Sequence, residues 1–229
     1  MGVDNIITFD AHDPRVQNAI PLSGFETVRP TYQFIKGLLR TVPDLIIDSD
    51  HMMAISPDEG GTSRAVYLAN VLGLDMGMFY KRRDYTQIVD GRNPIVAHEF
   101  LGSSVEGKDV IIIDDMISSG DSIIDVATEL KRRKAKRIFA AATFGLFTNG
   151  LDKFDKAYEE GIIHGILTTN LIYQTPELLS RPYYINCDLS KYIALLIDTL
   201  NHDGSISSIL SPNERIQHVV QKYKNGEPI

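Results

Sequence analysis

The chain has 229 residues, of which 43% are hydrophobic, and it carries a formal charge of −7. An acidic chain without a dominant basic face argues against a nucleic-acid-binding or membrane-surface protein. No apolar run reaches the roughly 18 residues that a membrane helix needs. The single cysteine, Cys187, excludes an internal disulfide and fits a reducing compartment, so we expect a cytoplasmic protein.

The chain opens on an apolar stretch, residues 5–9, which predicts a strand followed by a polar segment containing Asp10 and His12. These two side chains at a strand end are able to ligate a metal ion or contact a phosphate, although a lone histidine usually forms only hydrogen bonds. No helix or strand precedes this unit. We therefore expect residues 1–28 to be the remnant of a preceding α/β domain, with the chain truncated at its N-terminus.

The next units repeat the order of strand, polar loop and helix. Residues 27–39 have helical spacing, and residues 52–55 predict a strand that leads through a glycine-containing loop into a helix ending at Leu72. Gly60 and Gly61 let the backbone approach a ligand closely, and Asp58 is able to hold a metal. The loop is either a plain turn or a second phosphate or metal loop, and we favour the latter because a similar loop follows at residue 114.

Three cations follow the strand predicted at residues 76–80, namely Lys81, Arg82 and Arg83. Strand ends in a parallel sheet face the binding crevice, so these cations, with the polar residues 85–94, suggest a lid that brings positive charge to phosphates. The alternative is a solvated basic corner. Residues 95–101 predict an edge strand.

The most informative stretch begins with the apolar residues 110–113, which predict a strand buried on both faces. Asp114 and Asp115 follow, then a hydroxyl-rich turn at residues 118–122, then a helix with an apolar stripe over residues 123–130. Backbone N–H groups at such a helix start suit a phosphate, while the carboxylates suit ribose hydroxyls or a hydrated Mg²⁺. The alternative is an acidic strand end followed by an ordinary helix cap.

The rest of the chain continues the alternation. Strands are expected at residues 138–142, 162–167 and 183–187, and helices at residues 153–160, 191–200 and 214–223. The pattern predicts an α/β fold with a doubly wound, mainly parallel sheet and helices on both faces. Residues 29–229 are expected to form this domain, with a C-terminal helical tail.

Five segments resemble phosphoribosyl-diphosphate synthase (ribose-phosphate diphosphokinase), a family with the type I phosphoribosyltransferase fold. They occur in the family's order, at residues 10–17, 56–61, 81–83, 105–108 and 114–122. The turn at residues 114–122 is shared with the phosphoribosyltransferases, whereas Lys81 to Arg83 and the Asp10 segment distinguish the synthase. The resemblance implies the carboxyl-terminal portion of a synthase that transfers the diphosphoryl group of ATP to the C1 hydroxyl of ribose 5-phosphate, giving phosphoribosyl diphosphate and AMP.

The resemblance also implies roles for single residues. Lys81 would be catalytic with Arg83 beside it, and Mg²⁺ would lie with His12, Asp58 and Asp10. Ribose 5-phosphate would be bound by Asp114, Asp115, Ser118, Ser119, Gly120, Asp121 and Ser122. The family assembles as hexamers, so a homo-oligomer is expected.

The chain departs from the family at several positions. Asp121 stands where a glycine is usual, Thr143, Phe144 and Gly145 replace a Thr-His-Gly sequence, and no segment corresponds to the one that holds the adenine of ATP. Two other functions therefore stay open: a phosphoribosyltransferase that consumes phosphoribosyl diphosphate, and a regulatory subunit that binds phosphoribosyl ligands without turnover.

Overall fold

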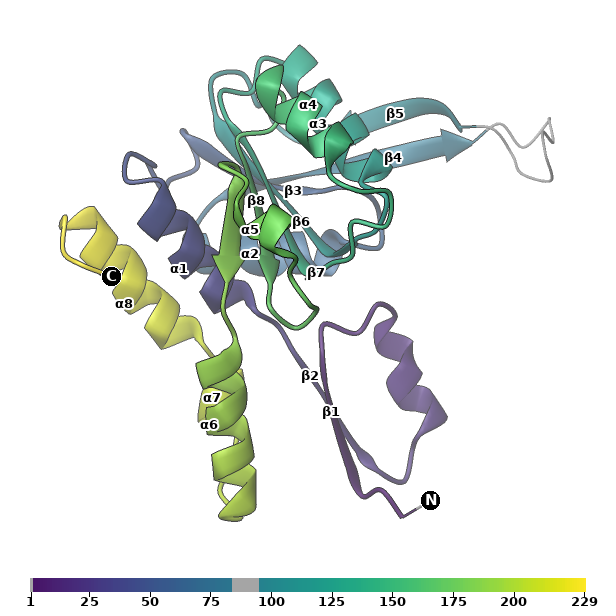
Figure 1. The fold of residues 1–229 in the computed structure, drawn as a ribbon, viewed down its shortest axis with the longest axis vertical. Helices are drawn as coiled ribbons and strands as arrows, with labels where there is room; N and C mark the ends of the chain where they lie inside the picture. Colours follow the sequence, from purple (N-terminus) through teal and green to yellow (C-terminus); the bar gives the residue numbers. More distant parts are fainter. Residues whose placement is uncertain (1, 84–94) are drawn as a thin grey trace.

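The computed structural model describes the backbone of residues 2–83 and 95–229 and the side chains of residues 2–80 and 99–229. Its central feature is a seven-stranded sheet (Figure 1). In spatial order the strands are β5 (Ile95–Leu101), β4 (Asp75–Arg83), β3 (Met52–Ser56), β6 (Asp109–Ile117), β7 (Ile138–Gly145), β8 (Gly165–Thr169) and β9 (Tyr184–Cys187). None of the helices in the described ranges combines the length and the hydrophobicity that a membrane span requires.

The direction of the chain across this sheet reverses between β3 and β6. From β3 the chain moves outward to β4 and then to the antiparallel edge strand β5, before it returns to pair β6 in parallel with the other side of β3. From β6 it continues in parallel to β7, β8 and β9. A crevice opens at such a switch point, outside the carboxyl ends of the two strands, because their connections leave on opposite faces.

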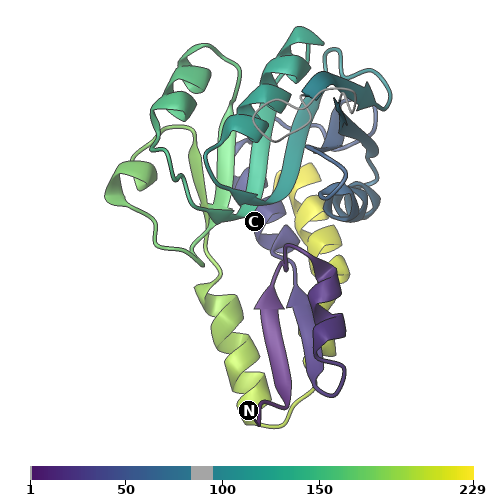
Figure 2. The ribbon, with the colours of Figure 1, turned by 90° about the vertical axis from the view of Figure 1, so that its right-hand side faces the viewer.

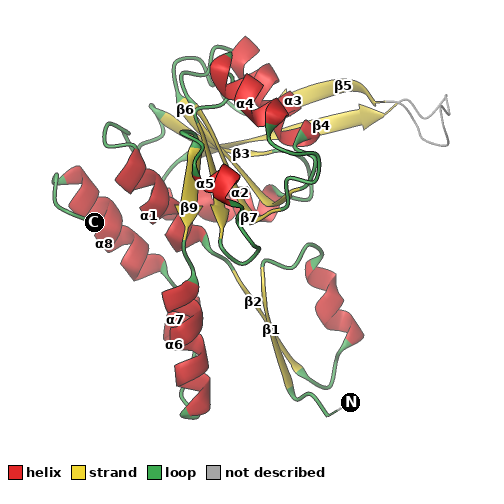
Figure 3. Cartoon of the chain, in the orientation of Figure 1, coloured by secondary structure: helices red, strands yellow, loops and turns green. Residues whose placement is uncertain are grey.

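Helices cover both faces of the sheet, as Figure 3 shows. Helices α1 (Thr31–Thr41), α2 (Thr62–Leu72) and α8 (Asn213–Lys224) pack on one face, and α3 (Asp121–Arg132) and α4 (Asp152–Glu159) pack on the other. Alternate strand residues enter the two cores: Ala54 joins the first cluster and Ile55 the second. Both faces are therefore apolar, which explains the unbroken apolar runs in the sequence.

The N-terminal segment forms a separate two-stranded parallel sheet. It contains β1 (Asn5–Phe9), the 3₁₀ helix η1 (Pro14–Ala19) and β2 (Gly24–Val28). Its apolar side packs on α6 (Ser190–Asn201) and α7 (Ser207–Leu210) through Val28, Leu196 and Ile209. Figure 2 shows β1 and β2 beside α6, below the main sheet.

The predicted fold class is confirmed, and most predicted elements are present with shifted ends. Strand β6 runs on to Ile117, so Asp114 and Asp115 lie inside the strand rather than after it. The helix predicted from residue 27 begins at Thr31, because residues 27 and 28 close β2 and Pro30 takes the N-cap position. Strand β2 and the short helices α5 (Pro176–Leu179) and α7 were not predicted. The division of the chain at residue 28 stays a prediction.

Candidate active site

A cavity of about 660 Å³ lies at the carboxyl ends of β3 and β6, where the switch point places it. Its wall comes from three segments far apart in the chain: residues 12–15, 58–60 and 114–116, with Arg64 and Tyr80. Four of the predicted site residues thus share one cavity, namely His12, Asp58, Asp114 and Asp115.

The two carboxylates of β6 differ in their environment. Burial is the main reason that the pKa of Asp114 rises to about 7, and the negative charges of Asp115 and Asp58 act in the same direction. Burial also disfavours the ionised form of Asp115, but hydrogen bonds from His12 and Asp114 and the positive charge of Arg64 outweigh it, so its pKa is lowered. Near neutral pH the pair therefore offers one carboxylate and one group that donates or accepts a hydrogen bond.

His12 is tied to the buried carboxylate. Its Nδ1 lies 2.8 Å from Asp115 Oδ2, while 76% of the His12 side chain is exposed. This hydrogen bond raises the pKa of His12. When Nδ1 carries the proton that Asp115 accepts, Nε2 keeps a lone pair available to a metal ion, and the carboxylate fixes the ring orientation.

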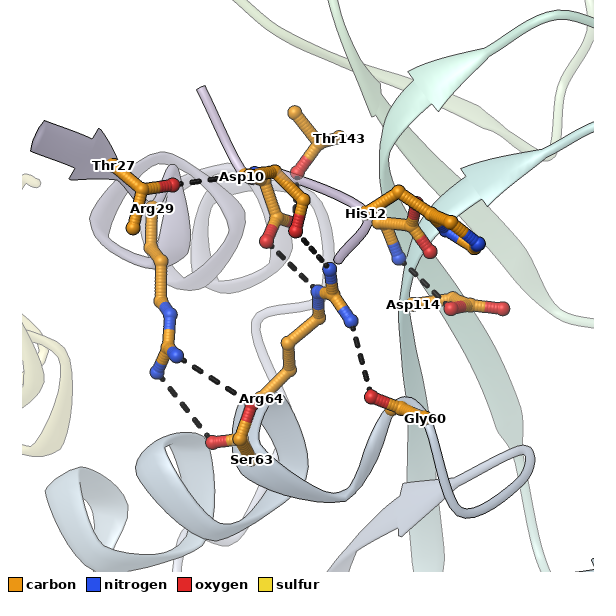
Figure 4. Close-up of polar contacts among 12 residues, drawn as sticks. Asp10, His12, Thr27, Arg29, Gly60, Ser63, Arg64, Asp114 and Thr143 are labelled. Carbon is orange, nitrogen blue, oxygen red and sulfur yellow. Dashed lines mark hydrogen bonds and ion pairs between the residues drawn. The ribbon is translucent and has the colours of Figure 1, made fainter. Parts of the chain in front are cut away.

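The Asp10 side chain is buried against Arg64 and Thr143 (Figure 4). Its Oδ1 accepts a 2.8 Å hydrogen bond from Arg64 Nε and its Oδ2 accepts a 2.7 Å bond from Thr143 Oγ1, with the Asp10 and Arg64 side chains 7% exposed. Arg64 also donates to Ala11 O at 3.2 Å and Gly60 O at 3.4 Å. Both Asp10 oxygens are thus engaged within the protein, and the metal role of Asp10 stays a prediction.

Arg64 was not predicted as a site residue. It clamps the segment after β1 onto the loop between β3 and α2, and so holds His12 beside Asp58. One signal was available in the sequence. Arg64, Ala65 and Leu68 share the buried face of α2, so a charged residue stands on an otherwise apolar face.

The loop between β3 and α2 is held by hydrogen bonds between its own residues. Gly61 N donates to Asp58 Oδ1 at 3.2 Å, and Ser56 Oγ donates to Asp58 O at 2.6 Å. A Cβ at Gly61 would lie 2.8 Å from Ser56 Oγ, so this turn needs a glycine. Asp58 is therefore held at the cavity wall by its own loop.

The predicted phosphate turn connects β6 to α3, with Gly120 at the N-cap in a left-handed conformation (φ 85°). A Cβ at Gly120 would lie 2.2 Å from the Phe154 ring, so a side chain there would require Phe154 to move. The following loop braces the turn, since Thr148 N donates to Ser118 O at 3.0 Å and Leu146 N donates to Ile117 O at 2.9 Å. The turn is thus a fixed scaffold whose helix-start N–H groups suit a phosphate.

Asp121, the residue that departs from the family, does not present an isolated charge to this turn. Its carboxylate forms an ion pair with Lys153 and accepts a 2.8 Å hydrogen bond from Ser119 Oγ. Lys153 is the main cause of the lowered pKa of Asp121. A cation from α4 therefore balances the extra acid.

The predicted catalytic residues Lys81 and Arg83 belong to strand β4. In the antiparallel pairing of β4 and β5, Lys81 lies opposite His98. The side chains of Lys81 and Arg83 fall outside the described residues, as do residues 85–94, which together with these cations were predicted to form a lid. Tyr80, the residue directly before Lys81, lines the cavity. The catalytic assignment stays a prediction.

The side chains around the cavity suit a Mg²⁺ ion that is coordinated mainly by the phosphates of a bound substrate. Among the described residues, no group of three or more His, Cys, Asp and Glu side chains is arranged to hold a metal ion. Mg²⁺ commonly takes one or two carboxylates and completes its shell with substrate phosphates and water. Asp58 and His12 fit that incomplete shell, since both line the cavity and His12 is hydrogen-bonded to Asp115.

Comparisons with known proteins identify the family of this chain. Residues 34–163 match the phosphoribosyl transferase domain family, so the chain belongs to that family. It is 30% identical over 218 residues to ribose-phosphate pyrophosphokinase of Vibrio parahaemolyticus, covering 92% of this chain and 62% of the relative. It is 29% identical to that of Mycoplasma pneumoniae, covering 91% and 60%. The chain therefore spans about three fifths of the length of these relatives.

One solved structure supports the fold. Phosphoribosylpyrophosphate synthetase from Mycobacterium smegmatis superposes with a TM-score of 0.71 at 22% identity, over 89% of this chain and 60% of that chain. At this identity the likeness establishes the architecture, with the mainly parallel sheet and its two helical layers.

Proposed function

We propose that the chain forms the ribose 5-phosphate and magnesium half of a ribose-phosphate diphosphokinase. The observation that supports this most is the single cavity that joins the β6 carboxylates, the hydrogen-bonded His12 and the Asp58 loop at the switch point. The relatives carry the corresponding name and resemble nearly the whole chain.

In this proposal each element of the site has a physical task. The N–H groups at the start of α3 hold the 5-phosphate, and Asp114 and Asp115 bind the ribose hydroxyls. Asp114 is suited to hydroxyl binding because its pKa of about 7 lets it donate or accept a hydrogen bond near neutral pH. The sugar is then held at both ends, with its C1 hydroxyl directed at the nucleotide.

The reaction requires the C1 hydroxyl oxygen to attack the β-phosphorus of ATP while the bond to the α-phosphate oxygen breaks, so that AMP departs and the hydroxyl proton is released to solvent. Positioning and neutralisation of charge account for most of the catalysis of such phosphoryl transfers. Bound Mg²⁺ would supply part of that neutralisation, with His12 and Asp58 as its protein ligands. Lys81 and Arg83 would supply the rest, at the end of β4.

The first test measures binding without turnover. Ribose 5-phosphate is titrated into the 229-residue chain by calorimetry, and we expect Asp115→Asn to weaken binding by about tenfold or more, as loss of a charge-assisted hydrogen bond does. Asp125→Asn is the matched control because Asp125 is an exposed acid further along α3. Equal affinity of Asp115→Asn and the control would contradict the proposed ribose site.

The second test measures AMP release from ATP with ribose 5-phosphate and Mg²⁺, by the chain and by a longer polypeptide that contains it. Ribose 5-phosphate binding without AMP release in either form would favour a regulatory phosphoribosyl-binding subunit. Pyrophosphate release from phosphoribosyl diphosphate in the presence of a nucleobase would favour a phosphoribosyltransferase instead.

A further inference from the structure

A second cavity of about 560 Å³ lies between α1, β9, the start of α6 and α8. It shares no lining residue with the candidate active site. Four cationic side chains line it, one or more from each of the three helices: Lys36, Arg40, Lys191 and Arg215. Asp188 is the one acidic side chain in the lining, so the wall is strongly positive in a chain whose net charge is −7.

Three of these cations have no carboxylate partner within ion-pair distance among the described residues. Lys36 and Arg215 instead both lie near the Tyr32 ring, with Lys36 Nζ 5.8 Å and Arg215 Cζ 5.5 Å from the ring centroid. Arg215 also donates to Ile209 O at 2.8 Å. Lys191 has neither an ion-paired carboxylate nor a cation–π contact with an aromatic ring in the described part of the chain.

The remaining two charges are already engaged. Arg40 Nε donates to the oxygen of Ile229, the last residue of the sequence, at 2.7 Å. Asp188 accepts hydrogen bonds from Asn170 Nδ2 at 2.9 Å and from the Ser190 backbone N–H at 2.7 Å. Its carboxylate is thus directed to Asn170 and to the Ser190 backbone rather than to the cations.

The cations of this cavity disfavour one another's charge. Burial and the like charges of Arg40 and Lys191 lower the pKa of Lys36. Lys191 stands in the first turn of α6 (Ser190–Asn201), where the positive end of the helix dipole disfavours a cation. A bound anion would relieve the repulsion among the cations and the unfavourable position of Lys191.

We propose that this cavity binds the phosphate or diphosphate group of a small anionic metabolite. A concave site of this volume fits a small molecule rather than a flat protein surface. The cations would hold the phosphate oxygens, as Lys and Arg do in charge-assisted hydrogen bonds. Tyr32, Tyr192 and Leu195 add an apolar wall against which a planar base is able to pack.

The test uses the 229-residue chain without Mg²⁺, titrated by calorimetry with inorganic diphosphate in one arm and ADP in the other. We expect saturable binding that Lys36→Gln and Arg215→Gln each weaken about tenfold or more, as removal of a charged partner does. Lys224→Gln is the matched control, since it removes the same charge from α8, away from the cavity lining. Tighter binding of ADP than of diphosphate would identify a nucleotide, and equal binding would identify the phosphate group alone.

Two further measurements separate this cavity from the candidate active site. The ring resonances of Tyr32 and Tyr192 are expected to shift during the titration, and Asp114→Asn is expected to keep its affinity for diphosphate. Absence of saturable binding in both arms would overturn the proposal, as would equal losses in Lys36→Gln and Lys224→Gln. The ribose 5-phosphate site would be untouched by either result, because its own test uses a different ligand and different variants.

Discussion

His12 Nδ1 lies 2.8 Å from Asp115 Oδ2, although 103 positions separate the two residues in the chain. His12 lies in the connection between β1 and β2 of the N-terminal two-stranded sheet, and Asp115 lies in the main sheet. The candidate site therefore straddles the junction of the two sheets. The boundary predicted at residue 28 places the two partners of this hydrogen bond in different domains.

This hydrogen bond leads to a prediction about metal affinity. Asp115→Asn is expected to weaken divalent-ion binding by about 10- to 100-fold, because the carboxylate orients the His12 ring and raises its basicity. Mn²⁺ bound in the presence of ribose 5-phosphate and ATP, measured by electron paramagnetic resonance, reports this affinity. Asp48→Asn is the control, since Asp48 accepts from an exposed histidine, His51, at 2.7 Å outside the cavity lining. Similar Mn²⁺ affinity in both variants would be evidence against His12 as a ligand.

The buried pair of Arg64 and Asp10 is expected to govern stability. Arg64→Met leaves the Asp10 carboxylate buried without a cation, which costs about 3–5 kcal/mol of unfolding free energy in comparable sites. Adding Asp10→Asn should recover part of the loss, because an amide is still able to accept from Thr143 and tolerates the left-handed backbone at Asp10 (φ 43°). Urea unfolding measures both variants.

Arg15→Met serves as the control for this pair. Arg15 pairs with Asp13 at 2.6 Å, but its side chain is 82% exposed, so we expect a change within about 0.5 kcal/mol. Comparable losses for Arg15→Met and Arg64→Met would mean that burial does not set the cost.

Asp121 and Lys153 are expected to tune phosphate affinity in opposite directions. Lys153→Gln exposes the Asp121 charge beside the phosphate turn, so ribose 5-phosphate should bind about two- to fivefold more weakly at low salt. Asp121→Asn should strengthen binding by a similar factor, and the double variant should lie near the parent chain. Calorimetry at two salt concentrations checks this, and an effect of Lys153→Gln that persists in the Asp121→Asn background would contradict it.

The unit around residues 110–130 could be predicted because its signals are local. An apolar run and a helical stripe describe β6 and α3 without knowledge of any other part of the chain. Strand β2 escaped prediction because Gly24 and Glu26 are poor strand formers and only Val28 at its end is buried, against α6 and α7.

The contacts of the site were less predictable than its residues. Arg64 meets Asp10 across 54 positions only because α2 and the N-terminal sheet are brought together by the fold. A metal role for Asp10 follows naturally from Asp and His two residues apart, yet the structure turns Asp10 inward to Arg64 and Thr143. Residue types at a strand end thus identify the chemistry, whereas packing decides which of them faces the cavity.

Gly120 is expected to be intolerant of any side chain. Gly120→Ala should destabilise the chain by about 1–3 kcal/mol more than Gly107→Ala, because a Cβ at Gly120 would meet the Phe154 ring at 2.2 Å. Gly107 also has a positive φ of 75°, but a Cβ there would have nothing within 4 Å. Gly107→Ala therefore measures only the cost of placing a side chain on left-handed backbone. Phe154→Leu in the Gly120→Ala background should remove part of the difference in thermal unfolding. Equal losses at the two glycines would show that Phe154 yields freely.

His164 is expected to make stability depend on pH. Its Nδ1 accepts a 3.2 Å hydrogen bond from the Ile138 backbone N–H, and burial together with the charges of Lys131 and Arg137 lowers its pKa below 6.5. As the pH falls through about 6.5 the unfolded chain takes up a proton at this residue and the folded protein does not, so stability declines by up to about 1.4 kcal/mol per pH unit. The decline ends once the pH passes below the folded pKa, and above pH 6.5 this residue has no effect.

His164→Asn keeps an acceptor for Ile138 and removes the titration. Urea unfolding should therefore show a shallower dependence of stability on pH between pH 6.5 and 5.5. His202→Asn, a change at a side chain that is 71% exposed, should leave the slope unaltered, and a slope unchanged by His164→Asn would place the titrating group elsewhere.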